Sequence, residues 1–116
     1  GFSVPRPSAE IAKGRSGFDI LAGKGRVVDA CGKDVTILYM NGARAVLEIA
    51  REHQCRYALL VNGSPSCGSS VIYDGSFAGR QHSGAGVAGA LLMQNGVEVF
   101  AETDIDVLQA RISASP

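Results

Sequence analysis

The chain has 116 residues, of which 46% are hydrophobic, and its 11 basic and 11 acidic side chains give a formal net charge of +0. This length and composition predict one globular domain and exclude a disordered tail or a small disulfide-stapled fold. The even charge gives no reason to expect nucleic acid or an anionic membrane as a partner, and no basic cluster stands out. No apolar run approaches the length of a membrane span, so we expect a cytoplasmic, reducing setting.

The first segment, residues 1–24, shows no sustained hydrophobic period, and we expect mostly loop with a short helical turn at 8–13. Pro5-Arg6-Pro7 predicts a stiff, extended stretch, because each proline fixes its own φ and restrains the residue before it. Arg6 has the geometry to bind a carboxylate or phosphate, although a surface salt bridge is the commoner role of a lone arginine. The segment resembles a connection, and we expect the natural protein to extend further toward its N-terminus.

The next elements are a short strand at 26–30 and an amphipathic helix from Asp34 to about Glu52. The helical spacing predicts one buried face, made of Val35, Leu38, Tyr39, Gly42, Val46 and Ile49.

Strands and helices then alternate to the end of the chain. We expect strands at 57–61, 71–73 and 97–101, a loop at 76–84, and helices at 86–94 and 104–112. This alternation predicts a single α/β domain over residues 1–116, with a three-layer, Rossmann-like, mainly parallel sheet flanked by helices.

A loop of small residues, Asn62–Ser70, lies between two of the predicted strands. In open α/β sheets ligands bind just beyond the carboxyl ends of strands, and this loop follows the strand at 57–61. Its glycines allow close approach of the backbone, its serines offer hydroxyls, and Cys67 offers a thiolate. A tight turn with a free thiol explains the same residues about equally well.

Residues Gly84–Gly89 spell G-x-G-x-x-G at the start of a predicted helix. A dinucleotide-binding fingerprint needs a strand that leads directly into the first glycine, and here about ten residues intervene after Tyr73. We therefore favour a glycine-rich helix entry in which Gly89 allows close packing.

Other polar side chains give weaker indications. Cys67 with His82 would make a thiol nucleophile pair, but a solvated His82 is the simpler interpretation. Asp74 follows a predicted strand, where catalytic groups gather, and a turn role explains it about as well. Cys31 and Cys55 match no zinc pattern, and a buried structural thiol is the expected role of each.

Taken together, several stretches resemble a bacterial family typified by thiouracil desulfidase. They are "PRPSAEI" (5–11), "GKDVT" (32–36), "SPSCG" (64–68), "YDGSFAG" (73–79), "GAGVAGALL" (84–92) and "NGVEVFAET" (95–103). The combination of the first, third and fourth stretches is specific, and the resemblance covers nearly the whole chain.

The resemblance implies an α/β domain that holds a four-iron, four-sulfur cluster through three cysteines. The fourth iron would be open to the soft sulfur of a thiolated pyrimidine. On this resemblance Cys67 is one cluster ligand and Ser64 lies at the active site. Beside them we assign substrate binding to Arg6, Ser66 and Gly68.

The other two cluster cysteines of the family belong to motifs upstream of "PRP", one of them a Cys-Pro-Glu segment. Cys31 and Cys55 do not match those motifs. We therefore expect this chain to be the C-terminal part of a longer family member, and by itself to lack the cluster and activity. The expected partner is a thiolated base as substrate, rather than nucleic acid or a membrane. The sequence is compatible with a homo-oligomer as well as with a monomer. The alternative is a nucleotide- or anion-binding α/β module without catalysis.

Overall fold

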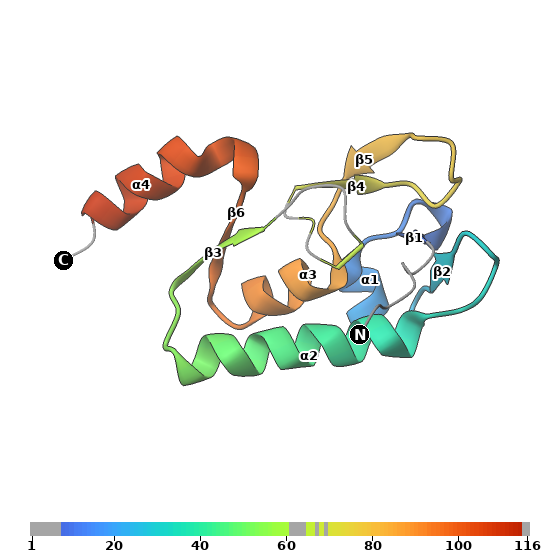
Figure 1. Cartoon of the computed structure of the whole chain (residues 1–116), viewed down its shortest axis with the longest axis horizontal. Helices are drawn as coiled ribbons and strands as arrows, with labels where there is room; N and C mark the ends of the chain where they lie inside the picture. The colour runs from blue at the N-terminus through green and yellow to red at the C-terminus, as the bar shows by residue number, and fades with distance from the viewer. Residues whose placement is uncertain (1–7, 61–64, 67, 69, 115–116) are drawn as a thin grey trace, which may run out of the picture.

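A computed structural model describes residues 8–60, 65–66, 68 and 70–114 (Figure 1). The strands are β1 (Ala9–Ile11), β2 (Val27–Asp29), β3 (Tyr57–Leu60), β4 (Val71–Tyr73), β5 (Gln81–Ser83) and β6 (Glu98–Ala101). The helices are α1 (Gly17–Leu21), α2 (Thr36–Glu52), α3 (Val87–Gln94) and α4 (Ile105–Ala114), with 3-10 turns η1 (Ala12–Gly14) and η2 (Glu102–Asp104). Among these described helices, none combines the length and apolar character needed to cross a bilayer.

The described strands form three small sheets of two strands each. β1 pairs with β2 and β4 with β5, both antiparallel, while β3 and β6 are parallel with Tyr57 opposite Glu98. β4 and β5 are joined by a short turn, which suits an antiparallel pair, whereas β3 and β6 are joined through α3, as a parallel pair requires. The prediction of a mixed α/β fold is confirmed. The predicted mainly parallel, three-layer sheet is not what the described strands form.

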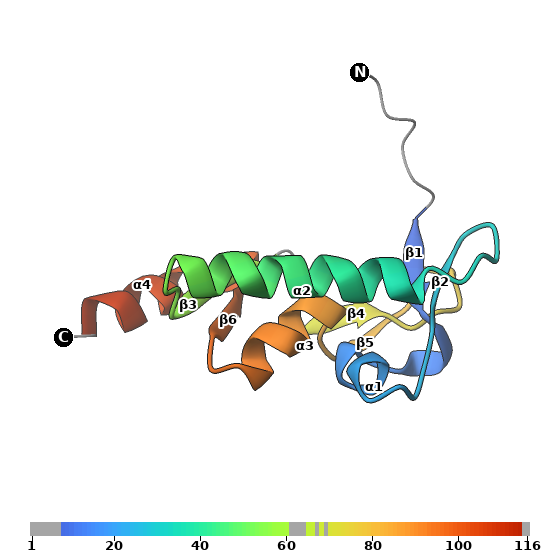
Figure 2. The same cartoon turned by 90° about the horizontal axis from the view of Figure 1, so that it is seen from below.

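Helices α2 and α3 connect the two ends of the molecule. α2 runs along one side with α3 packed against it, while α4 lies at the end opposite α1 and β1 (Figures 1 and 2). One buried cluster joins both helices to the N-terminal half through Ala43, Val87 and Ala88. A second joins them to β3 and β6 through Leu47 and Leu92. The α2–α3 pair is therefore shared by both parts of the core.

The buried face of α2 agrees with the predicted one only in part, since Val35, Tyr39 and Val46 pack against the core as predicted. Ala43 and Leu47 are buried, whereas Leu38 is 44% and Ile49 57% exposed. The helix carries two adjacent apolar stripes, and both satisfy helical spacing. Contact with α3 decides which stripe is buried, and that partner is invisible in the periodicity of α2 alone.

The N-terminal half also has more structure than predicted. α1 begins with a capping box in which the Ser16 N–H donates to Asp19 Oδ2 at 2.9 Å. The backbone of Gly17 lies so close to α3 that a Cβ there would overlap the carbonyl oxygen of Gly86. The predicted short helical turn at 8–13 is instead β1 followed by η1.

The corrected face of α2 is testable by truncating one residue from each stripe. Leu47→Ala should lower the free energy of unfolding by about 2–4 kcal/mol, because it leaves a cavity beside Leu92. Ile49→Ala should cost less than about 1 kcal/mol, because the side chain is largely in solvent. Urea unfolding of both variants measures the difference, and equal losses would contradict this packing of α2 on α3.

Candidate functional site

The small-residue loop is held by the first turn of α3. The N–H groups of Val87, Ala88 and Gly89 donate to backbone carbonyls of the loop: Val87 to Pro65 at 2.6 Å, and the other two to Ser66 at 2.9 and 3.1 Å. Those amides are the ones that a helix cannot satisfy within itself. The described part of the loop is therefore fixed by main-chain hydrogen bonds at a defined place.

Two glycines of the G-x-G-x-x-G stretch make room for this contact. A Cβ on Gly86 would lie 2.5 Å from the carbonyl oxygen of Ser66, and one on Gly89 would lie 2.5 Å from that of Gly68. The Gly86 N–H also donates to the Gly68 carbonyl at 2.8 Å. The packing interpretation of Gly89 is confirmed. Because the loop occupies the amides that a phosphate would need, the structure does not support a dinucleotide at this helix.

The predicted site residues fall into two groups. Ser66 is half-buried and Gly68 is buried, and both belong to the loop that α3 holds. Arg6, Ser64 and Cys67 lie outside the described residues, so the pairing of Cys67 with His82 is untested.

A hollow of about 460 Å³ lies between Ser66 and α2. The α2 residues that line it are Leu38, Tyr39, Asn41 and Gly42. Asn41 Oδ1 accepts a hydrogen bond from Arg44 Nη1 at 3.1 Å, which orients the amide. Sequence reasoning missed this hollow because Leu38 and Gly42 were assigned to the buried face of the helix. Tyr39 was assigned there too, and it does pack against the core while also lining the hollow. The sequence did contain one indication of this hollow: Gly42 lies in the middle of a helix whose other residues are mostly better helix formers.

The "PRPSAEI" and "YDGSFAG" stretches meet in space. Glu10 Oε1 accepts hydrogen bonds from the N–H groups of Gly75 at 3.0 Å and Phe77 at 3.2 Å. The Gly14 N–H donates to the Asp74 carbonyl at 2.8 Å. Gly75 and Phe77 both have positive φ, a conformation that needs such support at a non-glycine residue. Glu10 therefore fixes the turn between β4 and β5.

Asp74 is a turn residue in the structure. Its Oδ1 accepts the Ser76 N–H at 2.9 Å, and hydrogen bonds from the Ser76 side chain and backbone lower the pKa of Asp74. The turn interpretation therefore accounts for its position.

His82 lies opposite Ile72 in the β4–β5 pair. Its Nε2 atom is buried without a hydrogen-bond partner in the described part of the chain. The prediction that His82 is solvated is therefore wrong for its Nε2 atom.

Cys31 and Cys55 are exposed free thiols, so the expectation that they are buried is wrong. Cys31 precedes α2 and Cys55 follows it, on connections at opposite ends of the helix (Figure 1). A helix of 17 residues is about 25 Å long. The two thiols therefore do not fit one iron–sulfur cluster. Among the described residues, no three His, Cys, Asp or Glu side chains gather as a metal site.

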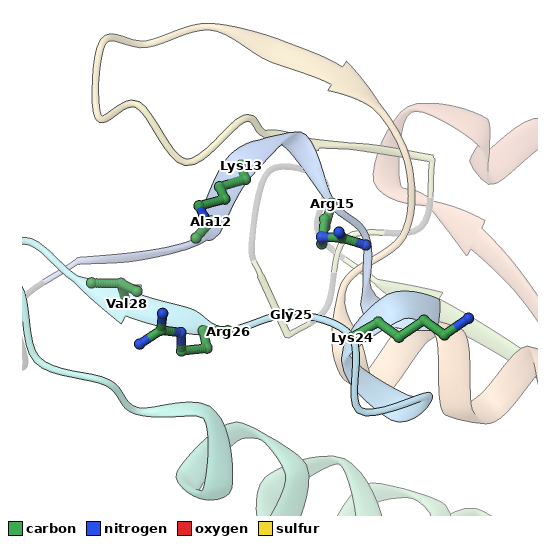
Figure 3. A pocket seen from close by; sticks show the side chains of 7 residues that line it. All are labelled: Ala12, Lys13, Arg15, Lys24, Gly25, Arg26 and Val28. Atoms are coloured by element: carbon green, nitrogen blue, oxygen red, sulfur yellow. The ribbon is translucent and has the colours of Figure 1, made fainter.

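A second hollow, of about 420 Å³, is lined by four cations (Figure 3). Two facing segments supply them: Lys13 and Arg15 come from one, and Lys24 and Arg26 from the other. A backbone hydrogen bond joins the two segments, since the Ala12 N–H donates to the Arg26 carbonyl at 2.8 Å. Arg15 lies 3.8 Å from Asp19, which offsets part of the charge. The sequence shows no basic run because the cations are spaced by neutral residues, so the expectation that no basic cluster stands out is corrected.

The family model described as 2-thiouracil desulfurase matches residues 1–104. The chain belongs to this family. It is 46% identical over 106 residues to the uncharacterized protein YbbK of Bacillus subtilis (strain 168), a match that covers 91% of this chain and 70% of YbbK.

A solved structure shares the fold. It is that of TudS, a 4Fe–4S-dependent thiouracil desulfidase, which is 38% identical to this chain with a TM-score of 0.82. The match covers 99% of this chain and 69% of TudS. The predicted resemblance to the desulfidase family is confirmed.

The contact between the loop and α3 predicts unequal effects at two neighbouring glycines. Gly86→Ala should cost about 1–3 kcal/mol or more, because its Cβ overlaps the backbone of Ser66. Gly84→Ala is the matched control, since its Cβ would have nearest neighbours at 3.4 Å. Denaturant unfolding compares the two, and a Gly86→Ala variant as stable as Gly84→Ala would refute the contact.

Proposed function

We propose that the protein to which this chain belongs removes sulfur from thiolated pyrimidines. Membership of the 2-thiouracil desulfurase family and the similarity to TudS support this activity. The observation that carries the proposal is the loop fixed on α3, because Gly86 and Gly89 of one family stretch hold the "SPSCG" stretch in place. Since both stretches carried the resemblance, their contact links the sequence pattern to one site.

In this proposal the site residues have separate roles. Cys67 is one thiolate ligand of the iron–sulfur cluster, and Ser64 acts at the reacting sulfur. Arg6, Ser66 and Gly68 bind the substrate. The two neighbours of Cys67 in the chain, Ser66 and Gly68, are held by main-chain hydrogen bonds from the start of α3.

The described cysteines of this chain do not supply a three-cysteine site, because Cys31 and Cys55 lie at opposite ends of α2. We propose that the two further ligands come from residues outside this sequence, and that the chain is the C-terminal part of a longer protein. Its 116 residues would then lack the cluster and activity on their own. The coverage of 70% and 69% of the two relatives supports this arrangement.

The same arrangement has consequences for the β3–β6 sheet and for the redox environment of the protein. We propose that the parallel β3–β6 pair belongs to a larger, three-layer parallel sheet in the whole protein, since an isolated two-stranded sheet is marginal. A cytoplasmic, reducing setting suits the two exposed thiols.

The alternative, an anion-binding module without catalysis, has support from one observation. Four cations line the hollow between residues 12–15 and 24–28. Binding of inorganic phosphate that is lost in Lys13→Ala, together with no sulfide release by the natural protein, would favour it.

The proposed ligand role of Cys67 predicts a selective loss of iron. The natural protein, purified without oxygen and reconstituted, should release sulfide from 2-thiouracil. Cys67→Ala should lose both the bound iron and sulfide release, because two thiolates hold such a cluster poorly. Cys55→Ala is the control and should keep both. Iron content and sulfide assays decide, and a Cys67→Ala protein with full iron and activity would sink the proposal.

A further inference from the structure

We propose that the hollow beside Ser66 is the seat of the substrate ring, and that Tyr39 and Asn41 of α2 recognise it. This inference rests on the proposed function and names the part of the site that reads the pyrimidine. The lining residues are Leu38, Tyr39, Asn41, Gly42 and Ser66, which we call the ring seat. Its volume of about 460 Å³ is within the range of small-molecule sites.

The position of the ring seat follows from the loop. Ser66 is held by hydrogen bonds from Ala88 and Gly89, and it directly precedes Cys67 in the chain. Consecutive Cα atoms are about 3.8 Å apart. A ring bound against Ser66 therefore lies next to the residue that we propose as the cluster ligand.

The chemistry of the ring seat suits a flat heterocycle with polar edges. Tyr39 offers an aromatic ring on which a base can stack, and Leu38 adds an apolar wall. Asn41 Oδ1 already accepts from Arg44, so the amide N–H groups are the donors that Asn41 offers to a ring carbonyl. Uracil and its thiolated forms carry such carbonyl or thiocarbonyl edges.

Gly42 has no structural reason to be a glycine. It lies within α2, has no positive φ, and a Cβ there would meet no atom within 4 Å. Glycine weakens a helix, because it loses more backbone entropy on folding than other residues. The absence of a side chain at Gly42 keeps the hollow beside Ser66 open, and a bound ligand requires such open space.

The test fills the ring seat without damaging the fold. Gly42→Leu should raise the melting temperature, since leucine is a better helix former and a Cβ at this position meets no atom within 4 Å. It should weaken binding of 2-thiouracil and uracil at least about tenfold, because its side chain takes the space of the ring. Ala45→Leu is the matched control, because Ala45 is an exposed residue of the same helix outside the ring seat.

Titration of the isotope-labelled 116-residue chain with each base, followed by amide NMR shifts, measures binding without a cluster. Saturable shifts at Leu38–Gly42 and Ser66 that are lost in Gly42→Leu and kept in Ala45→Leu support the ring seat. No binding at millimolar base, or equal binding by both variants, overturns it. Asn41→Asp should also weaken binding about tenfold, because a carboxylate has no donor for the carbonyl.

The natural protein separates this inference from the proposed function. There Gly42→Leu should raise KM for 2-thiouracil about tenfold with unchanged iron content. Normal KM in that variant would refute the ring seat and leave desulfuration standing. Binding at the ring seat without sulfide release from the reconstituted wild type would refute the function and leave the ring seat standing.

Discussion

The site depends on one set of hydrogen bonds, between the first turn of α3 and the carbonyls of the small-residue loop. Three helix amides that would otherwise lack partners bind Pro65 and Ser66. The contact exists only because Gly86 and Gly89 leave no side chain in the way. Any larger residue at either position would push the loop away from the helix, so the two glycines position the loop.

Further close contacts join the family stretches to one another or to α1. Gly17 of α1 lies against Gly86, and Glu10 fixes the turn at Gly75. Close backbone contacts therefore run from α1 through the start of α3 to Ser66. The sequence similarity to the desulfidases therefore reflects mutual packing of these segments as well as the chemistry that we propose at Cys67.

The sequence predicted the long helix and the strand at Val71–Tyr73, because each has a strong local signal. It did not predict β5, since Gln81-His82-Ser83 has no apolar alternation and pairs only because β4 lies beside it. The buried stripe of α2 and the ring seat also escaped prediction. Both depend on which element packs against α2, and a helical period cannot choose between two adjacent apolar stripes.

Amide hydrogen exchange at the start of α3 tests the central contact most directly. N-terminal helix amides without partners exchange quickly, whereas hydrogen-bonded ones are protected. Val87, Ala88 and Gly89 should exchange as slowly as Ala90, whose N–H donates within the helix to Gly86. Fast exchange at these three amides with slow exchange at Ala90 would show that the loop does not bind α3, and would contradict the account.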